Sequence, residues 1–293
     1  MTRRPDISYV IITYNDADNL GTAVDSAAEA SRAADMDCEV WVVDNGSTDH
    51  TAQVLERAGR RLGERLHTVM LGRNTGTTYS RNQALARATG RLFCVMDSDA
   101  RLLDGSLERV DRLLADFPEV GIVGPAIIMP DGSTYDSAKR FPTLGDKLRK
   151  LPSIFLGAAP VNRDWYDDFP FTRLRTVHTV ISCCWFMRRE VFERLGPLDQ
   201  RIFYAPEDVD YCLRCWKAGL AVVYYPGLRV LHHTQQVSHR RPLSRTALSH
   251  LKGLFYYWAK HRYLWRRDAL ARRYTAELAQ RLDPALAAWD QAH

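Results

Sequence analysis

Short apolar runs alternate with amphipathic segments over the first third of the chain, and this alternation restricts the fold more than any other feature. Helical periodicity marks the intervening segments, such as residues 17–33 and 77–88. The apolar runs themselves lie at residues 8–14, 39–43, 67–71 and 92–96. Strands that are apolar on both faces are typical of a parallel sheet with helices on each side. The sequence therefore predicts an α/β fold with a Rossmann-like sheet.

The second half of the chain has a weaker pattern. Its predicted elements are strands at residues 121–129, 177–187, 221–225 and 229–231, and a helix at residues 207–218. The stretch 141–176 has little periodicity and is long for a plain connection, so we interpret it as a substrate loop. Residues from 242 onward have the pattern of basic helices.

Polar residues follow three of the predicted strands at the point where each strand ends. The three groups are Thr13-Tyr14-Asn15, Asp44-Asn45 and Asp97-Ser98-Asp99. In open parallel sheets, ligands bind beyond the carboxyl ends of the strands. We therefore expect these side chains to line one binding edge of the sheet.

Two carboxylates one residue apart, Asp97 and Asp99, follow a predicted buried strand. Both could reach one hard cation, and Mg²⁺ or Mn²⁺ held in this way commonly takes diphosphate oxygens as well. A strand-end turn with solvated acids explains the same pattern, so the pair alone leaves both interpretations open. His232 and His233 follow a strand-like run, and one of them could complete the metal shell or be structural.

Asp44 and the residues after it also allow two interpretations. The Asp44 carboxylate could accept a hydrogen bond from a nucleobase N–H or a ribose hydroxyl. Ser47 or Thr48 could cap the helix that follows, as serine and threonine often do. The two interpretations are compatible with each other.

Glu207 and Asp208 lie at a predicted helix start. Acids in the first turn complement the helix macrodipole, which is a structural explanation. One of them could instead be a general base that deprotonates an acceptor hydroxyl. Crowding by neighbouring acids would raise its pKa, which suits that role.

Composition excludes several other classes of protein. The six cysteines lie mostly in apolar runs, and the Cys212–Cys215 pair has no second pair to complete a zinc site, so we favour structural roles. A formal charge of +5 over 293 residues does not indicate nucleic-acid binding. The N-terminus lacks the apolar segment of a signal peptide, and we expect a cytoplasmic protein.

Taken in order, these elements resemble glycosyltransferase family 2, whose members are inverting enzymes with the GT-A fold. The matching blocks are VIITYN at 10–15, VVDNGSTD at 42–49, NTG at 74–76 with Arg81-Asn82, MDSD at 96–99, GPLD at 196–199 and YAPEDVDYCLR at 204–214. The resemblance covers roughly residues 7–238, and the spacing is most similar to the bacterial rhamnosyltransferase-like branch. It implies a mixed sheet with helices on both faces.

The resemblance also implies a role for each matching residue. Asp44 would bind the uracil or thymine ring, Asp97 would face the ribose or act through water, and Asp99 would bind the metal directly. The implied nucleotide-binding set is Thr13, Tyr14, Asn15, Asp44, Asn74, Arg81, Asp97 and Ser98. The remaining implied roles are Asp99 with His232 or His233 for the metal, Trp185 and Glu207 for sugar and acceptor, and Asp208 as base with Glu207 in support.

The implied reaction is a single displacement that moves a sugar from a UDP- or dTDP-linked donor to an acceptor hydroxyl, assisted by Mg²⁺ or Mn²⁺. A nucleotidyltransferase is an alternative, but it would be expected to carry a basic Gly-rich loop where this chain has the acidic residues 15–19. A non-catalytic protein that binds sugar nucleotides is a second alternative. It would not need every acid of the set.

We expect a catalytic domain at residues 1–238, with a nucleotide-binding half at 7–100 and an acceptor half at 101–238, and a basic helical extension at 239–293. Residues 240–273 contain eight Arg, two Lys and one Asp, with apolar bulk from Leu251, Leu254, Phe255, Trp258 and Trp265. This surface could meet anionic lipid, which suits a lipid-linked glycan acceptor and a peripheral position at the inner face of the membrane. Alternatively, the aromatic side chains could pack on the catalytic domain or on the second subunit of a homodimer.

Overall fold

Twelve strands are present in the computed structural model, which describes residues 4–104, 107–155, 164–233 and 245–293. The strands of the first half are β1 (Ile7–Thr13), β2 (Cys38–Asp44), β3 (Leu66–Met70), β4 (Leu92–Asp97) and β5 (Ala100–Asp104). Those of the second half are β6 (Val120–Ile128), β7 (Thr134–Tyr135), β8 (Ala138–Lys139), β9 (Arg175–Thr176), β10 (Thr179–Val180), β11 (Cys184–Arg188) and β12 (Ala221–His232).

Helices connect these strands and continue to the C-terminus. Before β12 they are α1 (Ala17–Ala33), α2 (Thr51–Leu62), the short 3₁₀ turn η1 (Gly63–Arg65), α3 (Thr77–Leu85), α4 (Leu107–Asp116), α5 (Leu144–Phe155), α6 (Arg189–Leu195) and α7 (Glu207–Lys217). After β12 they are α9 (Arg245–His261), α10 (Arg267–Tyr274) and α11 (Ala276–Ala292).

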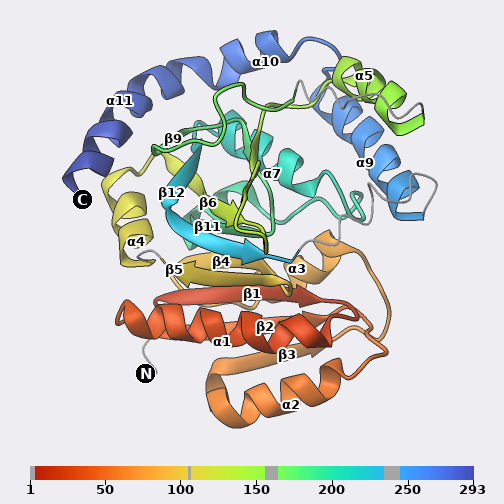
Figure 1. Ribbon diagram of the computed structural model, residues 1–293, viewed down its shortest axis with the longest axis vertical. Helices are drawn as coiled ribbons and strands as arrows, with labels where there is room; N and C mark the ends of the chain where they lie inside the picture. The colour runs from red at the N-terminus through yellow and green to blue at the C-terminus, as the bar shows by residue number, and fades with distance from the viewer. Residues whose placement is uncertain (1–3, 105–106, 156–163, 234–244) are drawn as a thin grey trace.

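Ten of the strands form one mixed sheet with helices on both of its sides (Figure 1). The strand order is β3-β2-β1-β4-β11-β6-β12-β5, with β7 beside β6 and β9 beside β12. The first four strands in this order are parallel, as their near-continuous apolar sequences predict. Then β11 runs antiparallel to both β4 and β6, which makes the sheet mixed. The predicted fold class is confirmed.

Three predictions for the second half are wrong in detail. Residues 177–187 form two strands rather than one, because the chain turns after β10, which pairs with β8 outside the main sheet. The two short strands expected at 221–225 and 229–231 are one strand, β12, with an irregularity between Tyr225 and Arg229. The stretch 141–176, predicted as a loop, contains helix α5. Residues 156–163 of this stretch lie outside the described part of the chain.

The C-terminal helices form an arc around the second half of the sheet (Figure 1). Leu254, Tyr257 and Trp258 of α9 are buried in the same hydrophobic core as the strands. Polar anchors add to this packing, since the Trp258 indole donates to the carbonyl of Pro142 and the Trp289 indole donates to Asp116. Helices α9 and α11 of the tail are therefore both bonded to residues between β5 and α6.

Candidate active site

The carboxyl ends of β1, β2 and β4 lie level with one another. In the sheet register, Thr13 is opposite Asp44 and Ile12 is opposite Asp97. The parallel pairing therefore brings the polar groups that follow these strands to one edge, as the sequence predicts.

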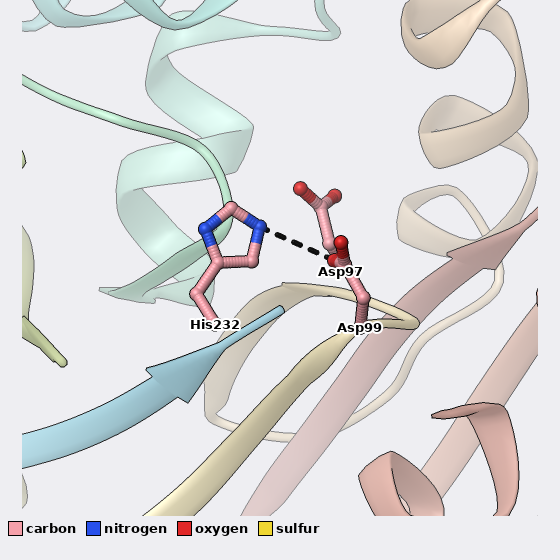
Figure 2. Close-up of side chains that lie close together, drawn as sticks. All are labelled: Asp97, Asp99 and His232. Carbon is pink, nitrogen blue, oxygen red and sulfur yellow. Dashed lines mark ion pairs between the residues drawn. The ribbon is translucent and has the colours of Figure 1, made fainter. Parts of the chain in front are cut away.

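Asp97, Asp99 and His232 form a cluster at this edge (Figure 2). One donor atom from each side chain lies within 4.8 Å of the others, and Asp99 Oδ1 is 3.2 Å from His232 Nε2. The cluster forms because β12 pairs antiparallel with β5, which sets His232 opposite Ala100 at the start of β5. Burial lowers the pKa of His232, but the hydrogen bond to Asp99 and the negative charges of Asp99 and Asp97 together outweigh burial, so the net pKa is raised.

The two histidines have different places. His233 donates its backbone N–H to the carbonyl oxygen of Asp99, and its exposed side chain lines a pocket of about 200 Å³ that Asp99, Asn19 and Arg101 also line. Only His232 joins the two acids, so the geometry distinguishes between residues that the sequence leaves equivalent.

The donor set of this cluster fits a hard divalent cation. Carboxylate oxygens are the ligands that Mg²⁺ and Mn²⁺ prefer, and imidazole nitrogen is an accepted ligand for first-row metals. Among the residues that the structure describes, no hydrogen-bond partner faces the buried Nδ1 of His232. Asp97 and Asp99 remain partly exposed, so a ligand can approach from the open side.

Arg81 joins this cluster to helix α7. Its side chain is 1% exposed, with one terminal nitrogen 2.6 Å from Asp97 Oδ1 and the other 2.7 Å from Glu207 Oε1. Ser182 completes the arrangement, since its hydroxyl contacts both Arg81 and Glu207. The resemblance implies a nucleotide contact for Arg81, but the guanidinium is instead enclosed between the acids of two elements.

Glu207 and Asp208 begin helix α7, as predicted, and have different surroundings. Burial raises the pKa of Glu207 to about 7, the negative charge of Asp208 adds to this effect, and Arg81 opposes it. Asp208 is more exposed than Glu207, and one of its carboxylate oxygens accepts from the Val209 N–H. Burial also raises the pKa of Asp208. A carboxylate with a raised pKa at an open position is suited to accept a proton.

The loop after β1 is bonded to the loop after β2. Asn15 has a left-handed φ of +52°, which asparagine tolerates better than most residues, and its side-chain oxygen accepts from the Thr48 N–H. Its own N–H donates to the Ser47 hydroxyl. The Asp44 carboxylate accepts from the Ser47 N–H at 2.9 Å. The two loops thus form one unit at the binding edge.

The predicted helix cap at Ser47 or Thr48 is wrong. Helix α2 begins at Thr51, whose N–H donates to Asp49 Oδ1. Ser47 and Thr48 lie farther upstream and bond to Asn15 instead, as described above. Asp49, two residues before Thr51, therefore accepts the hydrogen bond at the start of this helix.

Asn74 and Ser98 contribute to turns beside the site. The side-chain oxygen of Asn74 accepts from the Gly76 N–H and from the Asn45 side chain. The Ser98 hydroxyl donates to Asp16 at 2.6 Å. Asn45 and Asp16 belong to runs that the sequence marks as polar, but their bonding partners depend on the tertiary fold.

Tyr14 is exposed at the edge, whereas Thr13 is buried beneath it. The Trp185 side chain is 1% exposed on β11, with its ring centroid 5.8 Å from that of Tyr211. Trp185 therefore packs in the core beside α7, and its sugar or acceptor role stays a prediction.

Solved structures with the same architecture identify the fold of this protein. The mannosyltransferase PcManGT from Pyrobaculum calidifontis, solved with GDP-Man and Mn²⁺, has a TM-score of 0.60 and 22% identity, over 89% of this chain and 65% of that one. GalNAc-T7, solved with UDP, GalNAc and Mn²⁺, has a TM-score of 0.62 and 14% identity, over 93% of this chain and 57% of that one. The fold is the GT-A fold.

Sequence relatives make the assignment more specific. The profile described as "Glycosyl transferase family 2" matches residues 8–196, so the chain belongs to this family and is a glycosyltransferase. The N-acetylglucosaminyl-diphospho-decaprenol L-rhamnosyltransferase of Mycobacterium tuberculosis is 30% identical over 270 residues, which cover 88% of this chain and 85% of the relative. The dTDP-rhamnosyl transferase RfbF of Shigella flexneri is 25% identical over 236 residues, 78% of this chain and 69% of the relative.

Proposed function

We propose that this glycosyltransferase moves a deoxyhexose of the rhamnosyl class from a dTDP- or UDP-linked donor to a hydroxyl group of a lipid-linked glycan, with inversion at the anomeric carbon. The observation that carries the proposal is the chain of contacts from Asp97 through Arg81 to Glu207, which joins a candidate metal cluster to the acids of α7. The names of the two relatives support the choice of sugar and of a polyprenyl-linked acceptor.

The edge of β1, β2 and β4 is our proposed nucleotide site. Tyr14, Asn15 and Asp44 would contact the base and ribose. Asn74 and Ser98 would fix the surrounding turns, and Thr13 is buried at the end of β1 beneath them. Asp97, Asp99 and His232 would hold Mg²⁺ or Mn²⁺. When bound, the cation stabilises the charge that develops on the departing diphosphate.

Asp208 is our proposed general base. It takes the proton of the acceptor hydroxyl while the acceptor oxygen bonds to the anomeric carbon. The bond from that carbon to the diphosphate oxygen breaks in the same step, and its electron pair leaves with the nucleoside diphosphate. Glu207 is held by Arg81 and Ser182, so it orients the acid pair rather than moving the proton.

An Asp208→Asn variant tests this assignment. We expect kcat to fall by about 10² to 10⁴ while donor affinity is retained, because general base catalysis typically contributes that much and the amide keeps the shape of the carboxylate. The measurement is consumption of dTDP-rhamnose with an N-acetylglucosaminyl-diphospho-polyprenol acceptor, with donor binding followed by thermal shift. A Glu193→Gln variant, on the exposed face of α6, is the matched control. Near-wild-type turnover by Asp208→Asn would overturn the assignment.

We also propose that one face of α9 meets an anionic membrane surface. Leu248, Leu251 and Phe255 share a helical stripe, each is roughly half exposed, and exposed Lys252 and Arg262 flank them. Apolar side chains within a basic surface are the pattern of an interfacial helix. No helix among the described residues is long and apolar enough to span a bilayer.

A further inference from the structure

The segment 199–206, which leads into the acids of α7, is held from two directions. On one side is the start of α3. The Thr77 N–H donates to the carbonyl of Phe203 at 2.8 Å, and the Thr78 hydroxyl donates to the carbonyl of Ile202 at 2.7 Å. A methyl group on Gly76 would lie 2.1 Å from the Phe203 oxygen, so the two backbones are in direct contact. The nucleotide-binding half thus fixes one side of the segment.

Helix α9 of the C-terminal extension holds the other side. A methyl group on Gly253 would lie 2.1 Å from the carbonyl oxygen of Ala205, two residues before Glu207. The Tyr256 hydroxyl donates to Asp199 at 2.8 Å. Glycine allows this approach because any side chain would collide with the Ala205 backbone.

A buried ionic cluster ties α9 to α7 itself. Asp210, in the first turn of α7, is 1% exposed. Lys260 lies 2.7 Å from Asp210 and 2.9 Å from Asp199, and so bridges the segment to the helix. His261 Nε2 is 2.8 Å from Asp210, and His261 Nδ1 accepts from Lys217. Burying a carboxylate is costly unless it is paired in this way.

We propose that α9 is a positioning element of the active site, which fixes Glu207 and Asp208 through Gly253, Tyr256 and Lys260. The inference rests on the proposed role of Asp208 as base. None of the three α9 residues is a catalytic residue. They act on the chemistry only by placing the segment 199–206 and the first turn of α7.

A Gly253→Ala variant isolates the steric part of this role. Alanine is the better helix former by about 1 kcal/mol, so the substitution favours α9 itself while pushing on Ala205. We expect kcat to fall by about tenfold to a hundredfold, since small misplacements of reacting groups cost on that order, with the KM for donor within about twofold of wild type. Gly59→Ala is the matched control, because a methyl there meets only Leu66 Cδ2, at 4.0 Å.

A second pair of variants keeps the inference testable if Gly253→Ala does not fold. Lys260→Met is expected to lower kcat without changing donor KM, and Lys260→Arg is expected to restore most of the activity because it keeps the cation. Hydrogen exchange followed by mass spectrometry provides a readout other than activity. The amides of residues 199–210 should exchange faster in Gly253→Ala and Lys260→Met than in wild type, while β1 and β2 are unchanged.

The outcomes separate this inference from the proposed function. If wild type does not transfer sugar, or if Asp208→Asn is fully active, the proposed function fails. If those two proteins behave as expected but Gly253→Ala and Lys260→Met keep wild-type kcat and wild-type exchange at 199–210, the positioning role of α9 is overturned. Equal losses in Lys260→Met and Lys260→Arg with raised donor KM would also contradict it.

Discussion

Arg81 is a buried cation that holds carboxylates from two halves of the chain, Asp97 on β4 and Glu207 on α7. Its desolvation is offset only by these partners and by Ser182. Arg81 therefore couples the position of Asp97 to that of Glu207.

Replacing Arg81 by Met should destabilise the protein by about 3–5 kcal/mol, the usual cost of breaking a buried ion pair from one side. Chemical denaturation measures this change in the free energy of unfolding. Arg60→Met is the control, because Arg60 forms an exposed pair with Glu56, and such pairs contribute about 1 kcal/mol or less. Equal losses of unfolding free energy in the two variants would show that the buried ion pairs of Arg81 stabilise the protein no more than an exposed pair does.

At the same residue scale, the sequence is sufficient to locate Asp97, Asp99 and Asp208, because each lies at a strand end or helix start. It cannot choose between His232 and His233, which differ only in which way the end of β12 turns each side chain. Ser182 has no sequence signal at all. Its contact with Arg81 joins residues 101 positions apart.

At the scale of elements, periodicity predicts the type and the bounds of a single strand or helix. It fails where the bounds of an element depend on the strand or loop with which it pairs. Helix α1 has the predicted bounds, Ala17–Ala33. Residues 177–187 read as one strand in the sequence, yet they divide between two sheets because β10 pairs with β8 and β11 pairs with β4. The predicted cap of α2 is wrong for a similar reason, because Ser47 and Thr48 form hydrogen bonds with Asn15 instead.

At the scale of the whole molecule, the tail resolves into two faces. Of the apolar side chains that the sequence singles out, Leu254 and Trp258 are buried, while Leu251, Phe255 and Trp265 are exposed. One helix thus packs against the acids of α7 on one face and presents an apolar, basic surface on the other. Sequence alone leaves packing and membrane contact as alternatives for the tail. The structure shows the packing, and the exposed side chains are those on which the membrane proposal rests.

The exposed face of α9 leads to a prediction about membrane binding. Wild type should co-sediment with vesicles that contain phosphatidylglycerol more than with neutral phosphatidylcholine vesicles, and added salt should weaken the binding. A Leu251→Glu, Phe255→Glu double variant should bind at least about tenfold more weakly, since it loses both apolar contacts and adds charge. Met70→Glu, an exposed apolar position on β3, is the control. If binding changed neither with lipid charge nor with the α9 substitutions, this face of α9 would not be the membrane-binding surface.

The most direct test of the account is the rate of sugar transfer by the wild-type enzyme before and after removal of divalent cations. Asp97, Asp99 and His232 are proposed to hold a cation that contributes several kcal/mol to the transition state. Treatment with EDTA should therefore lower the rate of dTDP-rhamnose consumption by at least about a hundredfold, and added Mn²⁺ should restore it. Full transfer activity after exhaustive EDTA treatment would contradict the central claim.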